Sequence, residues 1–260
     1  MPSSKQPTKA QIRAFQNKVL SFYKSNARQL PWRATKNPYR ILLSEFMLQQ
    51  TQVSRVIYYT TWLKKWPTIN HLASTTRTKV LKAWMGLGYN RRAMYLHEAA
   101  KTIVTSFQGD VLKAMSHYDQ LKGIGEYTAS VVRIFSPNQD IVTLDTNIRR
   151  ILIHEFSLPE DIPDKELWQL AELCFPQGKS RDWHNALMDY GALYLTSKRT
   201  GISPKTKQSK FEGSDRQIRA KILKILLIQK TTIKTLEWSI SAIYAKTLKR
   251  ETHHSHPMYL

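Results

Sequence analysis

Glu45 is the residue whose surroundings first indicate chemistry. It stands inside an apolar run, Ile41-Leu42-Leu43-Ser44-Glu45-Phe46-Met47-Leu48. Burial among such neighbours disfavours the ionised form and raises the pKa of a carboxyl. A carboxyl with a raised pKa can serve as an acid near neutral pH. The spacing alone also fits a glutamate at the edge of the core that faces solvent or pairs with an arginine.

A second carboxylate, Asp145, comes just before a helical pattern that begins near Thr146. Aspartate at such a position commonly caps the helix by accepting hydrogen bonds from its first backbone N–H groups. Capping alone would account for the residue. Any catalytic role of Asp145 would be added to that cap.

Two glycines mark a tight turn between helical patterns, in Leu121-Lys122-Gly123-Ile124-Gly125-Glu126-Tyr127-Thr128. Glycine allows positive φ, and a helix N-terminus placed after such a turn favours a bound anion. A DNA phosphate can be held in this way without any reading of bases. An ordinary pair of helices with glycine as a cap fits the same pattern.

The charge of the chain favours a polyanionic partner. Its 260 residues hold 40 Lys and Arg against 19 Asp and Glu, a net charge of +21. Lysine and arginine bound to phosphates release counterions, so nucleic acid is favoured over acidic lipid or a merely solvated basic surface.

The single cysteine, Cys174, excludes an internal disulfide and a cysteine-ligated metal site. With no long apolar stretch and no signal peptide, we expect a cytoplasmic protein without a membrane partner.

Apolar residues recur at helical spacing, alternating strand patterns are nearly absent, and Pro or Gly interrupts the chain often. This predicts an all-α protein of many short helices. A core over 1–195 is followed by a basic linker over 196–213, which has few apolar anchors. Residues 214–250 are expected to form a small basic unit, either winged-helix-like or simply helical, and 251–260 a tail.

The hairpin resembles that of the helix-hairpin-helix base-excision glycosylases. The run from Trp32 to Val53, with Ser-Glu-x-Met-Leu-Gln-Gln-Thr-Gln-Val at its centre, resembles the first catalytic motif of the MutY-type adenine glycosylases. The similarity extends over about residues 10 to 195. It implies two helical lobes with the DNA groove and base pocket between them. The N-terminal helix and the residues after about 150 would form one lobe, and six central helices with the hairpin the other.

The resemblance implies excision of adenine mispaired with 8-oxoguanine or guanine in double-stranded DNA. Glu45 would protonate the base and Asp145 would stabilise the oxocarbenium-like sugar, as paired carboxylates do in glycoside cleavage. It further implies contacts with the base for Trp32, Arg33, Leu48 and Asp189, and contacts with the opposite strand for Gln49 and Gln50. Tyr89 would be an aromatic wedge in the base stack. Contacts with DNA phosphate are implied for Lys122, Gly123, Gly125 and Thr128.

Tyr127 stands where relatives with lyase activity carry a nucleophilic lysine. A tyrosine forms no Schiff base with the sugar, so base removal without strand cleavage is expected. Tyr127 would instead hydrogen-bond Asp145, with Asn147 as the second group that orients this carboxylate.

The chain departs from most relatives after Ala192, where their four cluster-binding cysteines are missing. We therefore expect no 4Fe–4S cluster and no metal. The cluster loop's contact with phosphate would pass to the lysines and arginine of the linker, unless these are simply solvated. The C-terminal segment is too short for the 8-oxoguanine-reading domain of many relatives. The sequence therefore leaves open whether 8-oxoguanine or guanine is preferred opposite the adenine.

Two alternatives remain at this point. A glycosylase acting on thymine or uracil opposite guanine would use the same scaffold, and Tyr127 suits it. A noncatalytic DNA-binding protein would keep the hairpin, but has no need for Glu45 and Asp145 together. We expect the protein to act as a monomer.

Overall fold

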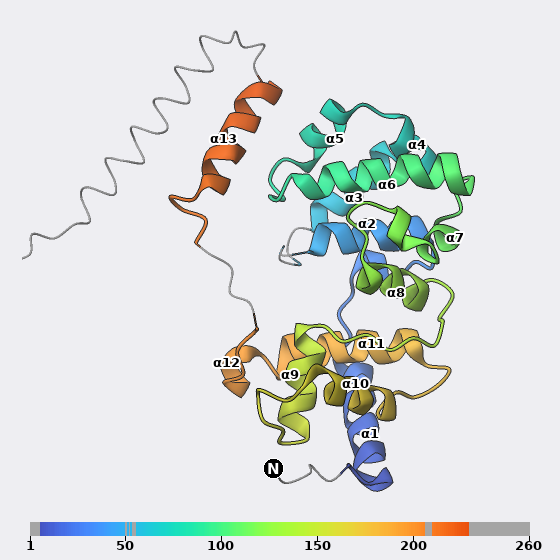
Figure 1. Cartoon of the computed structure of the whole chain (residues 1–260), viewed down its shortest axis with the longest axis vertical. Helices are drawn as coiled ribbons and strands as arrows, with labels where there is room; N and C mark the ends of the chain where they lie inside the picture. The colour runs from blue at the N-terminus through green and yellow to red at the C-terminus, as the bar shows by residue number, and fades with distance from the viewer. Residues whose placement is uncertain (1–5, 50, 52, 54–55, 206–209, 229–260) are drawn as a thin grey trace, which may run out of the picture.

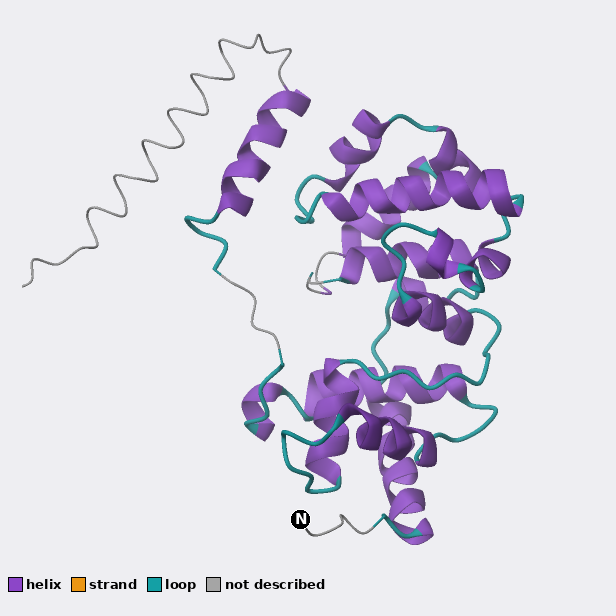
Figure 2. Cartoon of the chain, in the orientation of Figure 1, coloured by secondary structure: helices purple, strands orange, loops and turns teal. Residues whose placement is uncertain are grey.

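Helices form every regular element in residues 6–49, 51, 53, 56–205 and 210–228, the part of the chain that the computed structural model describes (Figure 2). The prediction of an all-α protein is confirmed. None of these helices has both the length and the apolar character needed to cross a bilayer.

The helices form two groups (Figure 1). The upper lobe packs Phe46, Trp62 and Trp84 into a core with almost no exposed surface. Within the described residues it holds one α-helix more than the expected six, because the short helix Val111–Met115 is a separate element. Its helical elements are α2 (Pro38–Leu48), α3 (Val56–Lys65), α4 (Ile69–Ser74), α5 (Arg77–Trp84), α6 (Arg91–Phe107), α7 (Val111–Met115), the 3-10 turn η3 (Tyr118–Gln120) and α8 (Glu126–Phe135).

The lower lobe joins the N-terminal helix to later parts of the chain. Phe15 of the N-terminal helix packs edge-on against Trp183, with ring centroids 5.6 Å apart. Such contacts bury the apolar faces of both helices and hold the ends of the core together. The elements are α1 (Lys9–Asn26), α9 (Thr146–Glu155), α10 (Asp164–Leu173), α11 (Ser180–Asp189), the π-helical turn η4 (Tyr190–Tyr194) and α12 (Ser197–Thr200).

Two stretches of chain cross between the lobes, one before α2 that contains the turn η1 (Pro31–Arg33) and one after α8. Arg181 of α11 ties them together. Its guanidinium donates hydrogen bonds to the carbonyl oxygens of Arg33 (2.7 Å), Thr35 (2.9 Å) and Phe135 (2.7 Å). The two stretches that connect the lobes are thus held together by hydrogen bonds from one side chain.

The expected linker over 196–213 needs correction at its start. Thr196 caps α12, and Ile202 is only 8% exposed because it packs into the lower-lobe core. Ile202 therefore anchors the start of the expected linker to the lower lobe, which the scarcity of apolar residues did not indicate. Helix α13 (Asp215–Ile228) fits the expected C-terminal unit. The rest of that unit, and the tail over 251–260, lie outside the described residues.

Candidate active site

Helix α2 carries Glu45 to the boundary between the lobes. The helix starts cleanly because Asn37 accepts a hydrogen bond from the Arg40 N–H (3.1 Å) and Pro38 occupies its first turn. Its other faces are buried in the upper core, which leaves Glu45 partly exposed toward the space between the lobes. No hydrogen bond or ion pair of the Glu45 carboxylate occurs within the described residues. Burial, with a smaller contribution from the charge of Asp145, raises the pKa of Glu45 to about 7.

Asp145 enters the same space from the lower lobe, as the N-cap of α9. It accepts hydrogen bonds from the Ile148 N–H (2.7 Å) and from the Asn147 side-chain amide (3.2 Å). Arg150 in turn donates to the Asn147 amide oxygen (2.8 Å) and fixes its orientation. Burial raises the pKa of Asp145, although these hydrogen bonds and the charge of Arg150 work against the rise. The prediction that Asp145 caps its helix is confirmed.

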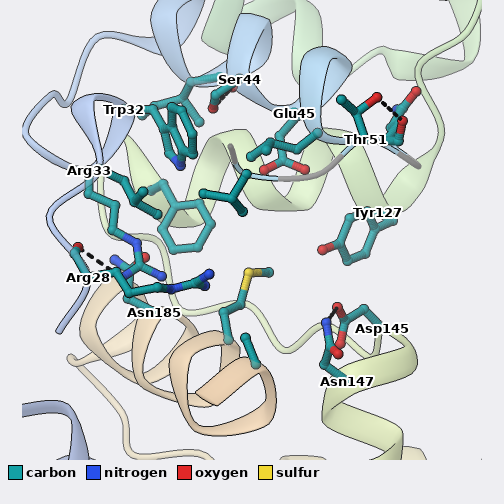
Figure 3. Close-up of a pocket in the computed structure, with 18 of the residues that line it drawn as sticks. Arg28, Trp32, Arg33, Ser44, Glu45, Thr51, Tyr127, Asp145, Asn147 and Asn185 are labelled. Carbon is teal, nitrogen blue, oxygen red and sulfur yellow. Dashed lines mark hydrogen bonds between the residues drawn. The ribbon is translucent and has the colours of Figure 1, made fainter. Parts of the chain in front are cut away.

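The two carboxylates face one cavity of about 440 Å³ (Figure 3). This volume suits one small planar ligand such as a nucleobase. The cavity brings together eight residues that the sequence singled out: Trp32, Arg33, Glu45, Leu48, Gln49, Tyr127, Asp145 and Asn147. Gln50, named with them, lies outside the described residues.

Tyr127 borders the cavity and is 36% exposed there. Protein still surrounds its phenol closely enough that burial, followed by the charges of Glu45 and Asp145, raises its pKa well above the usual value. The hydroxyl therefore stays neutral and can donate a hydrogen bond. The expected bond from Tyr127 to Asp145 is not among the hydrogen bonds of the described residues. The N-cap bond and Asn147 already engage both carboxylate oxygens of Asp145.

Asp189 requires a correction, because it does not line the cavity and is fully buried. Arg33 donates to both of its carboxylate oxygens (2.6 and 2.8 Å), and Arg28 pairs with it through its side chain and its backbone N–H. Burial alone would raise the pKa of Asp189, but these two arginines hold it below the usual value. Asp189 is thus placed to hold the arginines of the wall in position, rather than to touch a base.

The sequence missed three polar residues of this wall: Arg28, Arg181 and Asn185. Arg28 precedes the recognised motif, and the other two belong to α11. Nothing local marks Arg28 and Arg181, because their role comes from contacts with residues more than 100 positions away in the chain. With Arg33, Arg28 and Asn185 make the wall opposite Glu45 rich in hydrogen-bond donors (Figure 3).

The hairpin has the positive φ expected of a glycine turn at Gly123, whereas Gly125 is extended. Gly123 has φ +83°, and a Cβ there would lie 2.5 Å from the Tyr95 side chain, so only glycine fits. Gly125 is the N-cap of α8, and the Lys122 side chain is 68% exposed beside Glu98. Thr128 is a correction. It is only 5% exposed, because it lies on the face of α8 that packs into the core, and its side chain is closed to a phosphate.

Tyr89 lies apart from the cavity, in the turn between α5 and α6, with φ +46°. Its ring is flanked by two guanidinium groups, Arg92 at 5.5 Å and Arg216 at 5.3 Å. Arg216 of α13 also donates a hydrogen bond to the Tyr89 hydroxyl. Only the fold places α13 beside this turn, so the sequence contained no signal for the contact.

The residues present do not fit a 4Fe–4S cluster. Cys174, the one cysteine in the sequence, is 1% exposed in the lower core, and burial raises the pKa of its thiol to about 12. Clusters of this type need several accessible thiolates. Within the described ranges, no three His, Cys, Asp or Glu side chains gather as metal ligands would.

Comparison with known proteins agrees with this fold. Residues 43–176 match the HhH-GPD superfamily of base excision DNA repair proteins. The adenine DNA glycosylase of Mycolicibacterium smegmatis is 35% identical over 230 residues, which cover 80% of this chain and 78% of that protein. The chain belongs to the HhH-GPD superfamily. Within it, the relatives confirm the resemblance to the MutY-type adenine glycosylases and identify a DNA glycosylase.

Other comparisons extend this result. The human adenine DNA glycosylase is 34% identical over 204 residues, which cover 73% of this chain but only 37% of that protein. A thermostable thymine-DNA glycosylase has a similar structure, with a TM-score of 0.67 and 27% identity, over 75% of this chain and 91% of that one. An endonuclease III caught in a covalent complex with DNA shares the fold, with a TM-score of 0.64, 17% identity and 76% and 91% coverage.

Proposed function

We propose that this glycosylase removes adenine mispaired with 8-oxoguanine or guanine from double-stranded DNA, by hydrolysis and without cutting the strand. One observation carries the proposal. A cavity of nucleobase size joins Glu45, whose pKa is about 7, to Asp145, a carboxylate held by hydrogen bonds. The relatives named as adenine DNA glycosylases support adenine as the base.

Glu45 would act as the general acid. Near neutral pH a substantial fraction of this carboxyl carries its proton, because its pKa lies at about 7. Transfer of that proton to a ring nitrogen of the flipped adenine makes the base a neutral leaving group. The bond between the base and the sugar C1′ then breaks, and its electron pair leaves with the base.

Asp145 would stabilise the positive charge that the sugar acquires. The Asp145 charge contributes to the raised pKa of Glu45, which means that Asp145 ionises first and is the carboxylate of the pair. A water molecule then adds to C1′ and gives its proton to one of the carboxylates. The products are free adenine and an abasic site. Tyr127 would donate a hydrogen bond from its phenol to the sugar or the water, since the phenol stays neutral.

Hydrolysis without strand cleavage is supported by the residues that line the cavity. A lyase needs an amine that attacks C1′ and forms a Schiff base. Among the described residues that line the cavity there is no lysine, and Tyr127 occupies the position expected for one. Lys122 lies before the turn of the hairpin, with its side chain directed to Glu98 (3.6 Å).

The surface supports DNA as the partner. The net charge is +21, and the hairpin ends at the N-terminus of α8, where a phosphate is favoured. We further propose that the protein acts as a monomer in the compartment that holds the DNA, and without an iron–sulfur cluster. Tyr89 would enter the base stack, which offsets part of the cost of flipping.

The test is single-turnover excision on three duplexes, with adenine opposite 8-oxoguanine, adenine opposite guanine, and thymine opposite guanine. Strand breaks are scored before and after alkali treatment. We expect breaks at adenine that appear only after alkali. Breaks without alkali would refute the hydrolytic mechanism, and excision of thymine in place of adenine would favour the activity in the name of the structural neighbour.

A further inference from the structure

Arg92 is a buried arginine that bonds mainly to backbone carbonyl groups. It lies in the first turn of α6 and is 9% exposed. One of its guanidinium nitrogens, Nη1, donates to the carbonyl oxygens of Phe46 (2.7 Å), Met47 (3.3 Å) and Gln49. These carbonyls end helix α2, where oxygens lack helical partners and carry the negative end of the helix dipole. Arg92 thus completes the end of the helix that carries Glu45.

The other nitrogen of the fork, Nη2, reaches a different segment. It donates to the Leu87 and Gly88 carbonyls (3.3 Å each), which immediately precede Tyr89, and to the Thr51 hydroxyl (2.9 Å). The guanidinium also lies 5.5 Å from the centre of the Tyr89 ring and 5.4 Å from that of Trp84. One side chain therefore bonds both to the end of α2 and to the turn that carries Tyr89.

We propose that Arg92 is a positioning residue that couples the Glu45 helix to the Tyr89 turn, so that the acid and the DNA-contacting tyrosine are set relative to each other by one guanidinium. This inference rests on the proposed function for the roles of Glu45 and Tyr89. Glu45 lies one helical turn before Gln49, whose N–H bonds to the Glu45 carbonyl (3.1 Å). Loosening the end of α2 therefore alters the direction of Glu45. Insertion of Tyr89 into DNA would act on the same group of bonds.

Only arginine can make this bridge. Its planar fork presents several donors in fixed directions, whereas a lysine ammonium is a single point that cannot reach both sets of carbonyls. The guanidinium remains charged at neutral pH, although burial lowers its pKa to about 10. Thr51 belongs to the same bridge, since its hydroxyl is also 3.4 Å from the Leu87 carbonyl.

The test compares wild type with Arg92→Lys and a matched control, Arg149→Lys. Arg149 is likewise buried (8% exposed) and bonds to a backbone carbonyl, that of Glu160, but in the lower lobe. Amide hydrogen exchange is measured over residues 45–49 and 87–90. Single-turnover excision of adenine is measured with saturating enzyme, and the active fraction is titrated separately. A merely structural role would lower the active fraction and leave the rate constant per active enzyme unchanged.

For Arg92→Lys we expect faster exchange in both segments and a rate constant lower by about ten- to a hundredfold. Arg149→Lys should change neither. Faster exchange in only one segment, or an unchanged rate constant, would overturn the proposal. If Arg92→Lys does not fold, Thr51→Val decides, with the same two changes expected at smaller size. A wild type without excision would refute the proposed function, while the exchange data would still decide the coupling.

Discussion

The two lobes each supply one carboxylate to the cavity, and they treat these groups differently. Glu45 projects from within the apolar helix α2, where the described residues offer its carboxylate no hydrogen bond, and its pKa rises to about 7. Asp145 caps α9 and accepts hydrogen bonds at both oxygens. Burial raises the pKa of both carboxyls, but only Asp145 has hydrogen bonds and the charge of Arg150 to oppose that rise. Acid and charge stabiliser are assigned by helix position rather than by residue type.

The most severe test of these different roles of Glu45 and Asp145 is to neutralise each carboxylate in turn. Glu45→Gln removes the proton donor, so excision should fall by about 10²- to 10⁴-fold. Asp145→Asn removes the stabilising charge and should cost about 10²-fold. Single-turnover excision measures both, with binding to an abasic-site duplex as the control. Full excision by either variant would show that its carboxylate is not needed.

The wall opposite Glu45 offers a second test. Asp189→Asn leaves Arg28 and Arg33 without their buried partner, which should lower the free energy of unfolding by about 3 kcal/mol. Thermal or urea unfolding measures the change. Asp164→Asn is the matched control, because Asp164 pairs with Lys205 on the surface and its loss should leave stability nearly unchanged. Equal effects of the two variants would contradict the role assigned to Asp189.

The raised pKa of Glu45 also predicts how stability depends on pH. The folded state keeps this proton up to a pKa of about 7, whereas an ordinary glutamate loses it near 4.5. The unfolded chain therefore binds fewer protons between these values, and stability falls as pH rises through that window, by up to about 3 kcal/mol. Glu45→Gln should lack this fall. Parallel wild-type and variant stability curves against pH would argue against a buried carboxyl.

The smallest effect separates the two roles of Asp145. Asparagine caps a helix about as well as aspartate, whereas alanine costs about 1 kcal/mol. Asp145→Asn should therefore keep nearly full stability while its excision rate falls by about 10²-fold. Asp145→Ala should lose about 1 kcal/mol of stability as well as excision rate. Urea unfolding of the two variants measures the difference. Equal stability of both variants would mean that the cap on α9 contributes nothing.

Local signals predicted the helical elements and the two carboxylates, whereas the resemblance to a known family supplied the other predicted residues of the cavity. The apolar run around Glu45 predicted a carboxyl with a raised pKa, the position of Asp145 before a helix predicted its cap, and Gly123 marked the hairpin turn. Thr128 and Asp189 were misassigned because motifs do not show which face of a helix is buried. Arg28 and Arg92 were missed because their partners lie far along the chain and only the packed lobes bring them together.

The pH dependence of single-turnover adenine excision tests the central claim most directly. If Glu45 donates its proton, the rate constant should be nearly constant below about pH 7 and fall tenfold for each pH unit above it, since only the protonated form is competent. The residual rate of Glu45→Gln should lack this descending limb. A wild-type rate constant that stays level, or rises, from about pH 6 to about pH 9 would contradict the assignment of Glu45 as the acid.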